Sequence, residues 1–324
     1  MRASFDYAVS TGQSIAGIYV DVEKAFARLC RALVLPAPES DEVFISRLLG
    51  CGVSRKIAVA VLVKARSVDA WGKADGGSHL QALLTEMHTD TWASCEYLAA
   101  VIALSGGTLA GNALGDLVFT AAMTVLLTDL RGELRQAGLA GTYQVERDLL
   151  TGRPLDGINL EAETVDVSYV DDTFIPVIAP APMLIEKVAA TMTITNDVFT
   201  RHGFAMNLAT GKTEAVIAAH GRGADALKRR IAHELCNRIA FDGINGESKV
   251  LTCVSAYKHL GSKKGSTESM AAEVRENARP SQVWSATFGQ RFSPATSYRP
   301  RLKGICSKPS CCPGSCSTPA RGHC

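Results

Sequence analysis

The chain has 324 residues, of which 47% are hydrophobic and 20% are charged. This length corresponds to about two domains, and the composition excludes a wholly disordered, collagenous or coiled-coil protein. Because 34 Lys and Arg residues stand against 32 Asp and Glu residues, the net charge is only +2, which excludes a histone-like polycation. Any nucleic-acid surface must therefore come from local clustering of charge.

Two apolar runs, residues 97–104 and 117–127, are the longest in the sequence. Both are shorter than the roughly 18–20 residues that a membrane-spanning helix needs. The N-terminal residues contain no apolar core of a signal peptide. We therefore expect an intracellular, soluble protein, and the sequence does not distinguish nucleus from cytoplasm.

Apolar, β-branched stretches and helical patterns alternate along the chain. The predicted helices are residues 23–35, 41–49, 54–66, 112–137, 182–201 and 224–236. The predicted strands are residues 14–22, two strands within 163–178, 213–219 and 249–255. Residues 68–79 are expected to form a loop and residues 139–160 a surface excursion. Since the order lacks the regular cadence of a doubly wound sheet, we predict a mixed α+β fold.

Three aspartates stand at the ends of predicted strands. Asp21 ends the first strand, and Asp171 and Asp172 separate two later ones. Neighbouring side chains of a strand point to opposite faces, so two adjacent Asp can serve one site only at a turn, as at a hairpin tip. Clustered carboxylates repel one another unless divalent cations are present, and two Mg²⁺ (or Mn²⁺) ions held by Asp are suited to nucleotidyl transfer. The alternative is that this Asp-Asp pair is an ordinary turn dipeptide.

Five segments carry a resemblance to a known family. In chain order they are residues 19–26, 105–119, 169–172, 203–208 together with 212–214, and 257–261. Tyr-Val-Asp-Asp at 169–172 is similar to the catalytic hairpin of reverse transcriptases, and the other segments resemble further motifs of the non-LTR retrotransposon type. Their order along the chain also matches the family. Together these motifs are far more specific than any one of them.

The resemblance implies a polymerase palm, with an antiparallel sheet backed by helices, that copies RNA into DNA. The partners it implies are an RNA template, a DNA primer and deoxynucleoside triphosphates, with Mg²⁺ or Mn²⁺ as cofactor. Asp21 and Asp171 would bridge the metal ions and Asp172 would assist. The implied organisation is a palm core at 1–245, a primer-grip segment and start of the thumb at 246–290, and an irregular, Cys-rich basic tail at 291–324.

Further site residues follow from the same resemblance. Phe26 would select the sugar by excluding a 2′-hydroxyl, although it is alternatively a core aromatic. Gly107 of the Gly-rich loop would lie by the nucleotide. Lys212 would approach the nucleotide phosphates, or else is a solvated surface lysine. The primer-grip residues would be Tyr257, Leu260 and Gly261.

The sequence also departs from the family pattern. Gly106 replaces the usual Gln, and Ala110, Asn112 and Ala113 replace the usual Pro, Asp and Pro. Only about twenty residues precede Asp21, so we expect a chain truncated at its N-terminus with the fingers largely missing. Two alternatives stay open: a catalytically inactive, nucleic-acid-binding remnant of a retroelement, and a nucleic-acid-binding module whose basic tail makes the contacts. The cysteines of that tail lack the regular spacing of a zinc site.

Overall fold

The computed structural model describes most of the first 265 residues of the chain. The described ranges are 1–36, 39–67, 77–94, 100–104, 106–108, 113–145, 160–259 and 262–265. They all belong to the unit Met1–Glu276. The predicted tail at 291–324 lies outside the described residues, and the predicted division of the chain at 245 and 290 stays a prediction.

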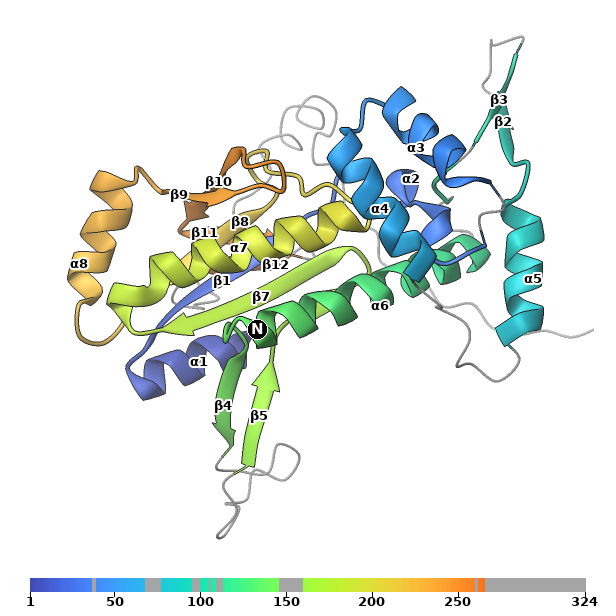
Figure 1. The fold of residues 1–324 in the computed structure, drawn as a ribbon. Helices are drawn as coiled ribbons and strands as arrows, with labels where there is room; N and C mark the ends of the chain where they lie inside the picture. The colour runs from blue at the N-terminus through green and yellow to red at the C-terminus, as the bar shows by residue number, and fades with distance from the viewer. Residues whose placement is uncertain are drawn as a thin grey trace, which may run out of the picture. The chain divides into compact units, whose positions relative to one another are not determined.

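A six-stranded sheet organises the described residues (Figure 1). Its strands, in spatial order, are β6 (Val167–Tyr169), β7 (Asp172–Ala179), β1 (Ser14–Val20), β8 (Glu214–Ala218), β10 (Ser248–Val254) and β9 (Arg238–Asp242). Antiparallel pairing joins every pair of neighbours except β8 and β10, which run parallel. The predicted α+β fold is confirmed, but the predicted antiparallel sheet is wrong, because the sheet is mixed.

The parallel pair has a simple topological cause. After β8 the chain continues through α8 (Ala224–Arg229) and the adjoining single-turn helix η3 (Arg230–Glu234), forms the edge strand β9, and returns as β10 beside β8. A parallel connection needs a crossover of a dozen or more residues, and the helices and β9 supply it. The predicted basic helix at 224–236 coincides with α8 and η3.

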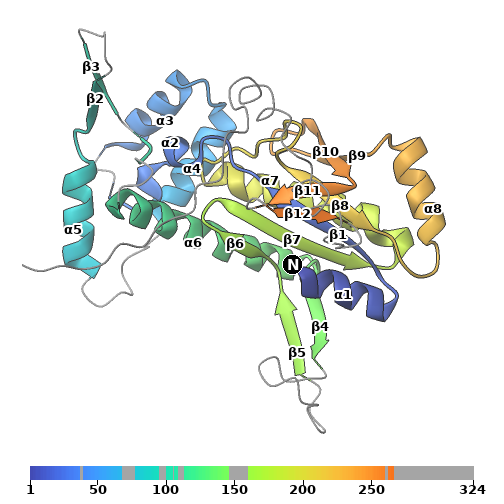
Figure 2. The same cartoon turned by 180° about the vertical axis from the view of Figure 1, so that it is seen from behind.

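Both faces of the sheet are covered, so the central strand β1 is buried along its whole length. Ala16, Ile18 and Val20 point toward α6 (Ala113–Gln136) and α7 (Leu184–Arg201), which form what we call the α6–α7 face. Ile15 and Tyr19 alternate with them and join a second cluster with residues of α1 (Arg2–Thr11), on what we call the α1 face. Figure 2 shows α1 on the side of the sheet opposite α7. This alternation is the two-residue period of a strand.

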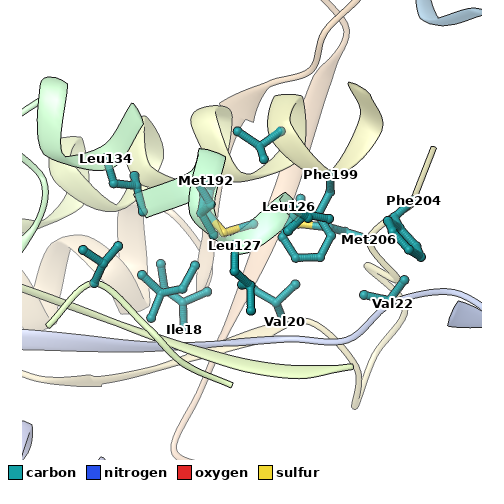
Figure 3. Packing of buried hydrophobic residues seen from close by; sticks show 14 of the residues in the cluster. Ile18, Val20, Val22, Leu126, Leu127, Leu134, Met192, Phe199, Phe204 and Met206 are labelled. Atoms are coloured by element: carbon teal, nitrogen blue, oxygen red, sulfur yellow. The ribbon is translucent and has the colours of Figure 1, made fainter. Parts of the chain in front are cut away.

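The main core lies between the sheet and the two long helices (Figure 3). Leu126 of α6 and Phe199 of α7 are fully buried, and both contribute to the cluster that contains Ile18 and Val20 of β1. The 24 residues of α6 contain no proline and only two glycines, which favours a long, uninterrupted helix. The predicted helices at 112–137 and 182–201 correspond to α6 and α7, the latter preceded by the short turn η2 (Ala181–Met183).

Smaller helices precede α6. They are α2 (Ala25–Arg28), the 3₁₀ turn η1 (Arg31–Leu33), α3 (Asp41–Gly50), α4 (Arg55–Ser67) and α5 (Gly77–His88). The predicted helices at 41–49 and 54–66 match α3 and α4, whereas the predicted helix at 23–35 is broken into α2 and η1. The break follows from the backbone, because Lys24 has φ 47° and Leu29 has the extended ψ of 120°.

Three two-stranded hairpins complete the described secondary structure. They are β2 (Trp92–Ser94) with β3 (Val101–Ala103), β4 (Gly141–Val145) with β5 (Leu160–Thr164), and β11 (Ala256–His259) with β12 (Ser262–Gly265). The excursion predicted at 139–160 therefore begins and ends in paired strands. In the part of the chain that the structure describes, no helix combines the length and the apolar character required to cross a bilayer.

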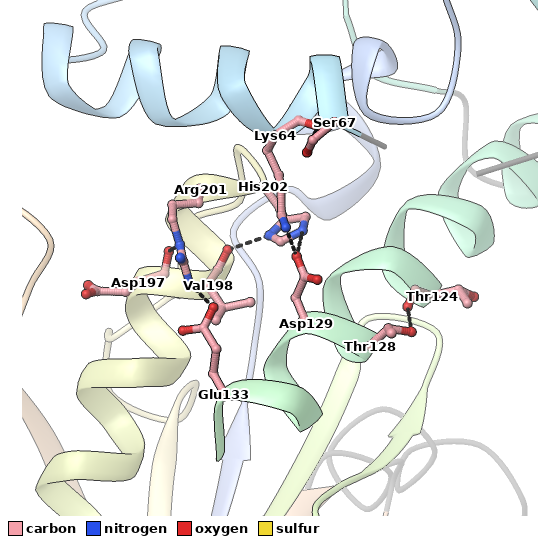
Figure 4. A network of polar contacts seen from close by, with 10 residues as sticks. All are labelled: Lys64, Ser67, Thr124, Thr128, Asp129, Glu133, Asp197, Val198, Arg201 and His202. Carbon is pink, nitrogen blue, oxygen red and sulfur yellow. Dashed lines mark hydrogen bonds and ion pairs between the residues drawn. The ribbon is translucent and has the colours of Figure 1, made fainter. Parts of the chain in front are cut away.

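A cluster of polar side chains lies where α4, α6 and the end of α7 come together (Figure 4). His202, at the C-terminal end of α7, is fully buried, and its Nδ1 donates to the Val198 carbonyl over 2.7 Å. Its Nε2 lies 3.1 Å from Oδ2 of Asp129 on α6, and the same carboxylate contacts the Lys64 ammonium on α4. Burial lowers the pKa of His202, because it disfavours the charged imidazolium.

Candidate active site

Asp21 directly follows β1 and is held by its backbone. Its N–H donates to Thr213 Oγ1 over 3.0 Å, and its carbonyl accepts from the N–H of Asn207 over 2.8 Å. The next residue, Val22, forms a bridge to Met206. The chain around residues 206–213 therefore fixes the point at which β1 ends, and only the carboxylate of Asp21 is left to interact with other groups.

Asp171 and Asp172 lie at the tip of the β6–β7 hairpin, as the sequence predicts. Tyr169 pairs with Asp172, so Val170 and Asp171 form a two-residue loop. Val170 has φ 57°, a left-handed conformation that a β-branched residue rarely adopts and that costs roughly 1–2 kcal/mol. Such strain is found preferentially at functional sites.

The register of the sheet brings Asp21 and Asp172 to the same end. In the β1–β7 ladder Val20 pairs with Thr173, and continuing this register by one residue sets Asp21 opposite Asp172. Tyr19 and Phe174, two residues further along each strand, both belong to the cluster on the α1 face. Since side chains two residues apart share a face, we assign Asp21 and Asp172 to that face as well.

Tyr257 lies on the α1 face of the sheet, next to Asp21 and Asp172. It is 8% exposed and stacks on Tyr19, with the ring centroids 4.5 Å apart. Burial is the main cause that raises the pKa of Tyr257 to about 12, and the negative charges of Asp21, Asp172 and Glu214 contribute to the same shift. Three carboxylates therefore act on one phenol. A phenol in this position is neutral at physiological pH.

Lys212 reaches the same carboxylate from the neighbouring loop. Its Nζ lies 3.3 Å from Oδ1 of Asp21, and the Lys212 side chain is 49% exposed. The two predicted alternatives for Lys212, a residue near the nucleotide phosphates or a solvated lysine, did not include this ion pair. The contact shows that the carboxylate of Asp21 accommodates a cation.

Within the described ranges, no three His, Cys, Asp or Glu side chains are close enough together to form a metal-binding group. Mg²⁺, however, is commonly bound through one or two carboxylates, with water and substrate phosphates as its other ligands. Asp21 and Asp172 are oxygen donors of the right kind at adjoining strand ends, and Asp21 already pairs with an ammonium. These residues fit a divalent cation that takes most of its ligands from outside the protein.

Phe26 lies in α2 and packs into the core. Its ring stacks on Phe119 of α6 with the centroids 4.2 Å apart, and its side chain is only partly buried. This contact accounts for the residue as a core aromatic. The role of Phe26 in selecting the sugar stays a prediction.

Gly107 lies beside the same short helix. Its N–H donates to the Leu29 carbonyl over 2.8 Å, and the N–H of Thr108 donates to the Phe26 carbonyl over 2.8 Å. Arg31 completes the junction, because its Nε donates to the Gly107 carbonyl over 2.7 Å. The Gly-rich segment is thus fastened to α2 and η1, and the predicted contact of Gly107 with a nucleotide stays a prediction.

Of the predicted primer-grip residues, Tyr257 is described as part of β11, and Leu260 and Gly261 lie outside the described residues. The stacking of Tyr257 on Tyr19 places its ring beneath the aspartates, on the α1 face. Thr213 and Glu214 were not predicted as site residues. Their position directly after Lys212 in a segment similar to a family motif was the signal that could have found them.

A separate cavity of about 1260 Å³ lies among α2, α3, α4 and the residues that follow α7. Arg28, Arg31 and Arg47 line it together with Glu39 and Glu247. None of the three predicted catalytic aspartates is among its lining residues. The cavity is therefore distinct from the end of β1 and the β6–β7 hairpin.

Comparison of the sequence with models of known protein families and with curated protein sequences gave no match.

Proposed function

We propose that this chain is the palm portion of an RNA-directed DNA polymerase of the non-LTR retrotransposon type. Its reaction is the metal-dependent transfer of a deoxynucleotide from its triphosphate to the 3′-hydroxyl of a primer, with release of pyrophosphate. The RNA template and the DNA primer are the macromolecular partners in this proposal. The motifs that resemble the reverse-transcriptase family supply the reaction class.

One observation carries the proposal. Asp21 and Asp172, which are 151 residues apart in the sequence, stand opposite each other at the adjoining ends of β1 and β7, and Asp171 occupies the strained hairpin loop beside them. An Asp-Asp dipeptide in an ordinary turn has no reason to stand opposite another aspartate at the end of a neighbouring strand. The placement of Asp172 opposite Asp21 favours a functional carboxylate site over the turn alternative.

The residues of the chain have distinct parts in the proposed reaction. Because the register sets Asp172 opposite Asp21, the proposal exchanges the roles that the resemblance implies for the adjacent pair: Asp21 and Asp172 would hold a divalent cation with their carboxylate oxygens, and Asp171 would assist from the loop. The cation, when bound, lowers the pKa of the primer hydroxyl and neutralises charge on the phosphates. Tyr257 and Tyr19 support the site as a stacked aromatic pair. Thr213 keeps the backbone of Asp21 in place.

The runner-up is a catalytically inactive, nucleic-acid-binding remnant of the same fold. The altered Gly-rich segment favours it, and so does the ion pair that already occupies Asp21. In this alternative the three aspartates are present but do not catalyse nucleotide transfer. Activity is therefore the property that separates the two candidates.

Primer extension on an RNA template tests the proposal. We expect the 324-residue chain to incorporate deoxynucleotides slowly in Mg²⁺ or Mn²⁺, and Asp171→Ala and Asp21→Asn to abolish incorporation. The matched control is Asp225→Ala, which removes a carboxylate that is 91% exposed on α8 and should leave the rate unchanged. The absence of incorporation by the wild-type chain, or incorporation that survives Asp171→Ala, would contradict the proposal.

A further inference from the structure

The ammonium of Lys212 occupies a position that a metal ion on Asp21 would need. Nζ of Lys212 lies 3.3 Å from Oδ1 of Asp21, while the Asp21 side chain retains only 21% of its exposure. A carboxylate oxygen that faces an ammonium at this distance has little room for a second cation on the same side. Like charges also repel, so the ammonium and a divalent ion would disfavour each other.

The contact is built by the segment Asn207–Glu214 rather than by the lysine alone. Asn207 and Thr213 bind the two backbone groups of Asp21, and the N–H of Thr213 donates to the Asn207 carbonyl over 2.8 Å. This closed set of hydrogen bonds holds the segment against the end of β1. Lys212 precedes Thr213, so its side chain starts one residue away from the backbone to which Asp21 is fastened.

A buried glutamate fixes the turn that carries Lys212. Glu214 is 4% exposed, and its Oε1 accepts the N–H of Gly211 over 2.7 Å. Gly211 has φ 79°, which glycine adopts without strain, and the N–H of Lys212 donates to the Ala209 carbonyl over 3.1 Å. The backbone on both sides of Lys212 is therefore set before its side chain is placed.

We propose that Lys212 is the resident counter-ion of Asp21 and that it sets the affinity of the site for divalent cations. A divalent ion that binds Asp21 has to displace the Lys212 ammonium. Because the lysine is half exposed, the ion pair is weak enough to exchange. The inference rests on the proposed function, since it takes Asp21 to be a ligand of a divalent ion.

Binding of Mn²⁺ to the full chain, followed by electron paramagnetic resonance without nucleotide or nucleic acid, tests the inference. We expect Lys212→Met to bind Mn²⁺ about twofold to fivefold more tightly than the wild type, which is the range set by partly exposed ion pairs. Lys212→Arg retains the charge and should behave as the wild type. Lys212→Gln repeats the loss of charge with a polar side chain, in case the methionine variant folds poorly.

The matched control is Lys228→Met, which removes an ammonium 3.5 Å from the carboxylate of Asp225 on α8 and should leave Mn²⁺ binding unchanged. If Asp21→Asn weakens Mn²⁺ binding but neither Lys212→Met nor Lys212→Gln tightens it, the counter-ion role is wrong and the proposed function stands. If Asp21→Asn has no effect on Mn²⁺ binding in either the wild-type or the Lys212→Met background, there is no divalent site at Asp21. That result would overturn the proposed function and the inference together.

Discussion

Gly107 lies where the Gly-rich segment passes too close to α2 for any side chain. It has φ 74°, and a Cβ atom built at this position would lie 2.6 Å from the carbonyl oxygen of Ala27. Since both the backbone conformation and the available space require glycine, the position tolerates no other residue without movement of α2.

Gly107→Ala should therefore destabilise the protein by about 1–3 kcal/mol, the cost of a strained left-handed residue. Urea unfolding measures this loss. The matched control is Gly132→Ala in α6, where an added Cβ would meet no atom within 4 Å. This substitution should stabilise the helix by about 0.5–1 kcal/mol. Equal effects of the two substitutions would show that the junction between Gly107 and α2 is not formed as described.

Single residues differ in how far the sequence could predict their surroundings. Asp171 and Asp172 are recognisable because apolar strands flank them on both sides. The ion pair of Lys212 with Asp21 spans 191 positions, so no local pattern encodes it. Arg31 donates to the carbonyls of Gly107 and His88, and backbone acceptors leave no trace in the sequence.

At the scale of elements, periodicity predicted the two longest helices well, whereas α1 and α5 were not predicted, and the loop expected at 68–79 is wrong at its end because α5 begins at Gly77. The strand expected at 14–22 is observed as Ser14–Val20, and α6 and α7 lie within about two residues of their predicted bounds. The helix expected at 23–35 has an apolar pattern but is interrupted near Leu29, where contacts with the Gly-rich segment override helix propensity. The edge strand β9 was not predicted, although its residues alternate between buried and exposed.

The junction of α4, α6 and α7 gives the fold a dependence on pH. His202 is surrounded by Asp129 from α6, Lys64 from α4 and Arg201 from its own helix, and burial is the largest cause that lowers its pKa. In the unfolded chain the pKa of this histidine is about 6.5, and in the folded state it is lower. Protonation therefore does not weaken the folded state as long as the pH is above about 6.5. Stability is lost as the pH falls further, because the unfolded state takes up the proton first.

We therefore expect the free energy of unfolding to decrease between about pH 7 and pH 5, by at most about 1.4 kcal/mol per pH unit from this residue. His202→Gln should show a smaller decrease over the same range, whatever its cost at neutral pH. Urea unfolding at several pH values gives both slopes. A variant whose slope equals that of the wild type would show that His202 does not lose its proton on folding.

At the scale of the whole molecule, the order of strands was the part that the sequence could not reveal. The candidate site depends on β1 lying between β7 and β8, and each neighbour comes from more than 150 residues later in the chain. The parallel placement of β10 beside β8 likewise follows from packing in three dimensions. The motifs indicate which residues belong together, while the register of the sheet determines which carboxylate stands opposite Asp21.

The charge of the chain is divided unevenly. Residues 291–324 contain six Lys and Arg and no Asp or Glu, so against the net charge of +2 for the whole chain, residues 1–290 carry −4. A polyanion such as RNA is attracted by local positive charge, and each phosphate that a protein neutralises adds to the salt dependence of binding. We expect the segment 291–324 to supply most of the non-specific attraction, and the aspartate site to contribute none.

Deletion of residues 291–324 should therefore weaken binding to an RNA–DNA duplex and lower the slope of log K against log salt by up to about 5, since each neutralised phosphate contributes about 0.9. The fold should be retained, because the sheet and its helices end well before residue 291. Fluorescence anisotropy of a labelled duplex between about 50 and 200 mM salt measures the slope. As a control, a full-length chain with the six basic residues of this segment replaced by Gln should match the deletion, which separates charge from length. An unchanged slope in both variants would mean that the phosphate contacts lie within residues 1–290, despite their net negative charge.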